Sequence, residues 1–181
     1  ALLDEGLSVT VIVNTALAPE DMRLPASLLE RLNGCFIREN LGFDFAAWAH
    51  AFSILKSGAS CRRLYLINDS IVGPLDSTEF HSIVADVRRA SADMVGLTEN
   101  SKPRPHLQSF FMAFNGHLLK SPLLADFMRG VLNLPTKDLV IDCYETQLTE
   151  FLRKAGYRCE ALFPNLSGHL GFDDETTRNW K

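Results

Sequence analysis

Short polar side chains directly follow an apolar segment near the middle of the chain. Asn68, Asp69 and Ser70 come after residues 63–67, whose sequence RLYLI is typical of a strand. A carboxylate flanked by short oxygen-bearing side chains suits a hard divalent cation, Mg²⁺ or Mn²⁺, that keeps most of its waters and bridges two phosphates. The same residue types also organise ordinary turns, and from spacing alone the turn is the more common role.

A second group of candidate ligand-binding residues begins at the last residue of the expected strand 35–38. Arg38 can offer a fork of donors to a phosphate, and Gly42 lets the backbone approach a ligand closely or take a positive φ. Asn40 and Asp44 complete the group, and a helix that begins here would favour an anion at its start. The alternative is that these residues only connect a strand to a helix, with Asp44 as the N-terminal cap of that helix.

Two further groups carry hydrogen-bonding or acid–base side chains. His106 and Gln108 precede the apolar segment 110–114, and both can hydrogen-bond sugar hydroxyls. His106 can also ligate a metal or move a proton. Glu145 is expected at the start of a late helix, where the dipole favours its charge and where it can serve as a general base. A surface histidine and a carboxylate that only favours a helix start are the ordinary alternatives.

The elements that must position these groups are predicted as strands alternating with helices. The helix after Pro25 is expected to end with Gly34 as its cap, and Asp76 with Glu79 predicts a capping box. We expect strands over 8–13, 35–38, 63–67, 94–97, 110–114 and 157–163, and helices over 25–32, 44–55, 76–87, 121–130 and 144–155. This alternation predicts an α/β fold whose mostly parallel sheet is flanked by helices, with ligands beyond the carboxyl ends of strands.

Composition restricts the class of protein. The 181 residues, 46% hydrophobic and 22% charged, suit one soluble globular domain, and no apolar run reaches the roughly 20 residues that a membrane helix needs. A net charge of -4 argues against a nucleic-acid partner. Four scattered cysteines indicate neither a zinc site nor a disulfide framework, which fits a reducing, cytoplasmic setting. The chain lacks an initiator Met, so we expect an excerpt of a longer protein.

Three blocks of sequence, taken in order, resemble the rhamnan synthesis protein F family. The blocks are 38–48 (RENLGFDFAAW), 66–75 (LINDSIVGPL) and 106–111 (HLQSFF). The resemblance covers most of the chain from about Val9 onward. It implies a single GT-A-like glycosyltransferase domain, a three-layer sandwich that here lacks its first strand. It also implies a role in assembling bacterial cell-surface polysaccharide, such as lipopolysaccharide or cell-wall glycan.

The resemblance also implies roles for individual residues on the donor side. The donor would be a nucleoside-diphosphate sugar such as dTDP-rhamnose, with Arg38, Asn40, Gly42 and Asp44 against its nucleotide or sugar. Asp69 stands where such enzymes carry an Asp-x-Asp metal motif. Only one carboxylate is present there, between Asn68 and Ser70, so the expected Mn²⁺ or Mg²⁺ dependence is the weakest part of the resemblance.

On the acceptor side, His106 and Gln108 would lie near the acceptor or the transferred sugar. Glu145 stands where inverting enzymes place the base that deprotonates the acceptor hydroxyl, and His169 is a further candidate metal or phosphate contact. The acceptor would be a polysaccharide or a lipid-linked glycan, with the protein in the cytoplasm at the inner face of the plasma membrane. Membrane association would come only from other segments or partners.

Two other functions remain open on the sequence. A non-catalytic carbohydrate-binding or scaffold domain would keep the fold without turnover, which agrees with the single carboxylate and the absent first strand. A metal-dependent phosphohydrolase that uses Asp69 is the third hypothesis. Nucleophile elbow, Walker, dinucleotide-binding and zinc-protease motifs are all absent from the sequence.

Overall fold

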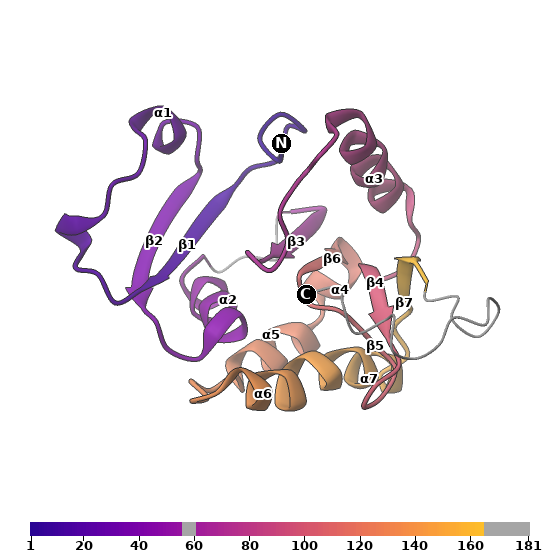
Figure 1. Cartoon of the computed structure of the whole chain (residues 1–181). Helices are drawn as coiled ribbons and strands as arrows, with labels where there is room; N and C mark the ends of the chain where they lie inside the picture. The colour runs from indigo at the N-terminus through magenta and orange to yellow at the C-terminus, as the bar shows by residue number, and fades with distance from the viewer. Residues whose placement is uncertain (56–60, 165–181) are drawn as a thin grey trace, which may run out of the picture.

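Strands and helices alternate along most of the chain, as Figure 1 shows. The structure, a computed structural model, describes residues 1–55 and 61–164. The strands are β1 (Thr10–Thr15), β2 (Gly34–Glu39), β3 (Arg63–Ile67), β4 (Met94–Asn100), β5 (His106–Leu107), β6 (Phe111–Asn115) and β7 (Cys159–Phe163). The α-helices are α1 (Ala26–Leu29), α2 (Phe43–Leu55), α3 (Ser77–Arg89), α4 (Gly116–Lys120), α5 (Pro122–Arg129), α6 (Lys137–Val140) and α7 (Thr146–Lys154). A 3₁₀ turn (Pro19–Asp21) and a π-helical turn (Ile141–Glu145) complete the described elements.

The strands are mixed in direction, so the expectation of a mostly parallel sheet is wrong. β1 pairs with β2 in parallel, and β4 pairs with β7 in parallel. β6 runs antiparallel to both of its neighbours, β3 and β4, and the short β5 runs antiparallel to β4. Only residues 101–110 separate β4 from β6, too few for the helical crossover that a parallel return requires.

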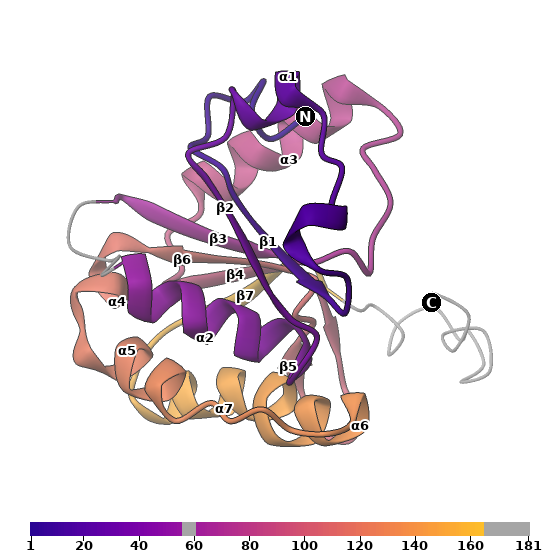
Figure 2. The ribbon, with the colours of Figure 1, turned by 90° about the vertical axis from the view of Figure 1, so that its left-hand side faces the viewer.

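Helices cover both faces of the strands, which confirms the expected α/β layering. In Figure 2, α3 lies on one side of β3, β6, β4 and β7, while α2, α5 and α7 lie on the other side. Successive side chains of β6 point to opposite faces of the sheet, which explains why two apolar cores form. Phe111 and Ala113 pack in the cluster that contains Val87 of α3, whereas Met112 and Phe114 pack in the larger cluster that contains α2 and α7 residues.

Helix boundaries agree with the sequence signals where a local cap exists. Asp76 accepts hydrogen bonds from two backbone N–H groups of the first turn of α3, and the Ser121 hydroxyl accepts one from Leu123 at the start of α5. α1 is shorter than expected and ends at Leu29. Gly34 begins β2, so its expected role as the cap of α1 is wrong.

The late helix begins well before the expected position. Thr136 caps α6, and the helical path then runs through the π-helical turn into α7 without a break in right-handed backbone angles. Glu145 therefore ends the π-helical turn in the interior of this helical segment. The expectation that it stands at a helix start, and gains from a helix dipole there, is wrong.

β1 and β3 lie on opposite sides of a break between two sheets. Among the described strands, β1 pairs with β2 and β3 pairs with β6, so no ladder joins β1 to β3. Figure 1 shows the β1–β2 pair apart from the remaining strands. Within the described residues, no helix is both long and apolar enough to span a membrane.

Candidate functional site

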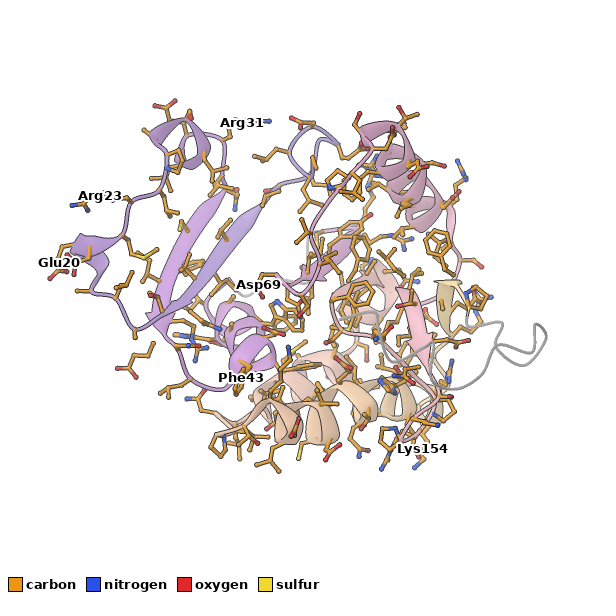
Figure 3. The ribbon with its side chains drawn as sticks, viewed as in Figure 1. Glu20, Arg23, Arg31, Phe43, Asp69 and Lys154 are labelled. Carbon is orange, nitrogen blue, oxygen red and sulfur yellow. The ribbon has the colours of Figure 1, made fainter. Side chains whose placement is uncertain are left out.

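Polar side chains after β3 meet the first turn of α2. The Asn68 side-chain amide donates a hydrogen bond to Asp44 Oδ2 at 2.6 Å, and Asn68 Oδ1 accepts one from the Ser70 backbone N–H at 3.0 Å. Asp69 is exposed beside them. Figure 3 shows Asp69 between the β1–β2 pair and the other strands, above α2. Four of the candidate residues, from two separate sequence blocks, thus come together.

A second set of hydrogen bonds joins the ends of β1 and β2 to the same turn. The Asn14 amide donates to the Phe43 carbonyl oxygen at 3.2 Å, and Asn14 Oδ1 accepts from Arg38 Nη1 at 3.1 Å. Arg38 also donates to the Leu41 carbonyl and, at 3.3 Å, to Asn133 Oδ1. These oxygens are all uncharged, so none of these bonds neutralises the Arg38 guanidinium.

Asp44 lies inside the first turn of α2, which begins at Phe43, so its expected role as the N-terminal cap is wrong. Its side chain turns to Asn68 instead. Burial raises the pKa of Asp44 above its ordinary value, and the negative charges of Asp69 and Glu145 raise it further. The Asn68 hydrogen bond and the charge of Lys137 oppose the rise. The charges of Asp69 and Glu145 therefore both act on Asp44.

We expect Asp44→Asn to increase stability at neutral pH by up to about 1 kcal/mol, because an amide keeps the acceptor for Asn68 and removes a half-buried charge. Asp44 has a raised pKa in the folded state, so stability falls as pH rises from its ordinary value of 3.8 through the folded value. The gain should vanish below that interval and be complete above it. Urea unfolding across pH measures it, and Asp142→Asn, an exposed carboxylate, is the control. Equal gains from both variants would contradict this account.

Glu145 forms a compact buried group with His106 and Ser109. The Ser109 hydroxyl and backbone N–H, the latter at 3.3 Å, both donate to Glu145 Oε2. His106 Nε2 lies 3.4 Å from Glu145 Oε1, and His106 Nδ1 lies 2.7 Å from the Arg104 carbonyl oxygen. His106 and Ser109 are only 3% and 5% exposed. The expected alternative for His106, a surface histidine, is therefore wrong.

The pKa values of His106 and Glu145 are shifted in opposite directions from their ordinary values. Burial lowers the pKa of His106, but the hydrogen bonds with Glu145 and the Arg104 carbonyl outweigh it, and the net pKa is raised. Burial raises the pKa of Glu145, but the hydrogen bonds from His106 and Ser109 outweigh it, and the net pKa is lowered. Glu145 is thus a carboxylate at neutral pH.

The remaining candidate residues, within the part of the chain that the structure describes, make no side-chain hydrogen bond to Asp44, Asn68 or Glu145. Gly42 is buried with a φ of +69° against Ala46 and Asn133, so packing already explains this glycine. Asn40 is exposed on a hollow of about 550 Å³ beyond the ends of β1 and β2. Gln108 Oε1 accepts a hydrogen bond from the Thr98 hydroxyl at 2.7 Å. His169 lies outside the described residues.

A divalent cation fits this site only if substrate phosphates supply some of its ligands. Within residues 1–55 and 61–164, no three His, Cys, Asp or Glu side chains gather in a set that could hold a metal ion. Mg²⁺ and Mn²⁺ sites in which one or two carboxylates act together with substrate phosphates need no such set. The exposed Asp69 carboxylate matches that second kind of donor set.

Sequence reasoning missed Asn14 and Ser109. Asn14 directly follows an apolar run of the sequence, as Asn68 does, although Asn14 is still within β1 and Asn68 follows β3. Ser109 lies within the block 106–111, but a single serine carries no signal of its own. Its partner Glu145 is 36 residues away in sequence. Only the fold brings these two side chains together.

Comparison with known proteins gives a family match and distant relatives. The family model described as rhamnan synthesis protein F matches residues 9–171. Virulence protein VirA of Vibrio anguillarum strain ATCC 68554 / 775 is 29% identical over 132 residues, which are 70% of this chain and 41% of that protein. A second Vibrio anguillarum sequence of the same name matches to the same extent. The chain thus spans less than half the length of these curated relatives.

Proposed function

Because this chain belongs to the rhamnan synthesis protein F family, we propose that it is a glycosyltransferase domain that acts in polysaccharide biosynthesis. It would move a sugar, rhamnose by the family's description, from a nucleoside-diphosphate sugar to a growing cell-surface polysaccharide. The fold is then of the GT-A kind. The observation that carries this proposal is the hydrogen bond between Asn68 and Asp44, which joins two polar sequence blocks, and the charge of Glu145 also acts on Asp44.

The donor would lie beyond the ends of β1, β2 and β3. The hollow of about 550 Å³ beside Asn40 is within the size range of small-molecule sites and can take the nucleoside. Asp44, Asn68 and Ser70 would bind the sugar or the phosphates. Arg38 would face the donor from the edge of the same hollow. Asp69 would hold a divalent cation together with the donor phosphates, and that cation supplies positive charge against the leaving diphosphate.

Glu145 would act as the general base. Its carboxylate would accept the proton of an acceptor hydroxyl while that oxygen bonds to the anomeric carbon. The bond from the anomeric carbon to the diphosphate oxygen breaks, and the nucleoside diphosphate leaves with the electron pair. Gln108, whose side-chain N–H groups have no hydrogen-bond partner within residues 1–55 and 61–164, would orient the acceptor or the transferred sugar.

We expect Asp69→Ala to abolish metal-enhanced donor binding and to leave the fold intact, because Asp69 is exposed and has no structural hydrogen bond through its carboxylate among the described contacts. Calorimetric titration of dTDP and UDP, each with and without Mn²⁺, measures it. Asp86→Ala removes a carboxylate of α3 and is the matched control. Unchanged Mn²⁺-dependent binding by Asp69→Ala would contradict the assigned role.

The alternative function is a non-catalytic carbohydrate-binding or scaffold domain of the same fold. The single carboxylate between Asn68 and Ser70 favours it. The titration separates the functions when followed by incubation with dTDP-rhamnose and a glycan acceptor. Turnover that requires the acceptor supports the transferase, and binding without turnover supports the alternative. Donor hydrolysis without an acceptor would instead indicate a phosphohydrolase.

A further inference from the structure

The buried ring of His106 contacts a backbone carbonyl, which only accepts hydrogen bonds, and a carboxyl group, which only accepts them when it is ionised. Nδ1 lies 2.7 Å from the Arg104 carbonyl oxygen, and Nε2 lies 3.4 Å from Glu145 Oε1. A neutral imidazole carries one N–H, whereas an imidazolium carries two. The arrangement therefore requires one additional proton, which is shared between His106 and Glu145.

Ser109 decides where that proton resides. Its hydroxyl and its backbone N–H both donate to Glu145 Oε2, and two donors on one oxygen stabilise the ionised carboxylate. The proton then belongs to His106, which becomes a buried imidazolium beside a carboxylate. A second charged side chain near His106 is that of Arg104, whose guanidinium hydrogen-bonds to Gln147 and Glu150.

The bonds to Glu145 leave little of its carboxylate free. A carboxylate has about four lone-pair positions. Ser109 occupies two on Oε2, and His106 occupies one on Oε1. One position on Oε1 remains.

β5, which carries His106 and lies just before Ser109, is held along the helix that carries Glu145. The Leu107 N–H donates to the Thr149 hydroxyl at 3.0 Å, and Thr149 is fully buried. Glu145 and Thr149 are four residues apart and thus lie on one face of the helix. A π-helical turn ends at Glu145, and such turns are frequent at functional sites.

We propose that His106 and Ser109 are positioning residues, which hold Glu145 ionised in one orientation and leave a single Oε1 position to accept the hydrogen bond of an acceptor hydroxyl. This inference rests on the proposed function. It gives His106 the role of a fixed positive charge. Because both ring nitrogens are engaged, His106 neither ligates a metal nor transfers the proton of the acceptor.

Nuclear magnetic resonance of the substrate-free protein tests the proton count. With ¹⁵N-labelled histidine, both His106 ring nitrogens should be protonated at pH 7, and Glu145→Gln should return the ring to a single N–H. The signals of His81, on the surface of α3, should not move in that variant. A wild-type His106 with an unprotonated Nε2 at pH 7 would overturn the proposal.

The carboxyl titration of Glu145, followed by ¹³C, tests Ser109. Ser109→Ala should move the midpoint upward, because one donor to the carboxylate is lost, whereas Ser109→Thr, which keeps the hydroxyl, should not. In turnover, Ser109→Ala should lower kcat about tenfold with little change in the donor KM, and threonine should restore it. A midpoint that does not respond to Ser109→Ala overturns the positioning role.

These measurements separate two kinds of failure. The proton count and the carboxyl titration need no substrate, so they can fail while sugar transfer is observed, and the inference alone is then wrong. If they give the expected results but no acceptor-dependent turnover occurs, the transferase function fails and Glu145 is an ordered carboxylate in a non-catalytic site.

Discussion

Replacing Glu145 with glutamine is expected to lower the rate constant of sugar transfer about 10²- to 10⁴-fold, the usual contribution of a general base. Glutamine has nearly the same shape and keeps an oxygen that can accept from Ser109. It cannot take the proton of the acceptor hydroxyl. Donor binding measured by calorimetry should remain, because the donor-side residues are in or after β2, on α2 and after β3.

The control is Glu150→Gln on the same helix. Glu150 pairs with Arg104 and Lys154 at the surface, and exposed ion pairs contribute little to stability. Its substitution should leave turnover within about twofold of wild type, since it removes the same charge without touching the site. Thermal melting of both variants checks that the fold is kept. Wild-type turnover by Glu145→Gln would exclude Glu145 as the base.

Replacing Gly42 with alanine is expected to lower the free energy of unfolding by about 2 to 4 kcal/mol, the sum of left-handed strain and overpacking. The backbone φ of +69° disfavours any side chain. A Cβ at this position would also lie 2.5 Å from the Ala46 Cβ and 2.7 Å from the Asn133 Cα. The Asn133 backbone cannot yield easily, and the Asn133 side chain contacts Arg38.

Gly6→Ala separates the two causes of that loss. Gly6 has the same φ of +69°, but nothing lies within 4 Å of its hypothetical Cβ. Urea unfolding should therefore show a loss of only about 1 kcal/mol for Gly6→Ala, from strain alone. Equal losses of unfolding free energy in the two variants would mean that the residues around Gly42 can move to accommodate the added Cβ. Donor binding by Gly42→Ala, measured under folding conditions, then tests the separate prediction that Gly42 approaches the donor.

Strong local signals in the sequence predicted many of the elements. RLYLI at 63–67 forms β3, Asp76 caps α3, and Ser121 with Pro122 begins α5. The signals are local because a strand needs only a β-branched or apolar run, and a cap needs only a side chain within two or three residues. The same kind of signal placed Asn68, Asp69 and Ser70 at the end of a strand.

Predictions from local sequence failed where the contact that decides the structure is made by a residue distant in sequence. Asp44 has the residue type and position of a cap, but Asn68, 24 residues later, takes its carboxylate. Glu145 precedes a sequence with the periodicity of an amphipathic helix, which predicted a helix start there. The helical segment in fact begins earlier, at Thr136. In both cases a competing contact, absent from the local sequence, overrides the local preference.

The sequence by itself therefore determined the family, the alternation of strands and helices, and the polar residues that end the strands, because these depend on residue types and short spacings. Only the tertiary structure decided that β6 runs antiparallel, that Asn68 joins Asp44, and that Ser109 and His106 enclose Glu145. Each of these depends on which segments pack together, and that choice reflects the summed burial and hydrogen bonding of residues distant in sequence.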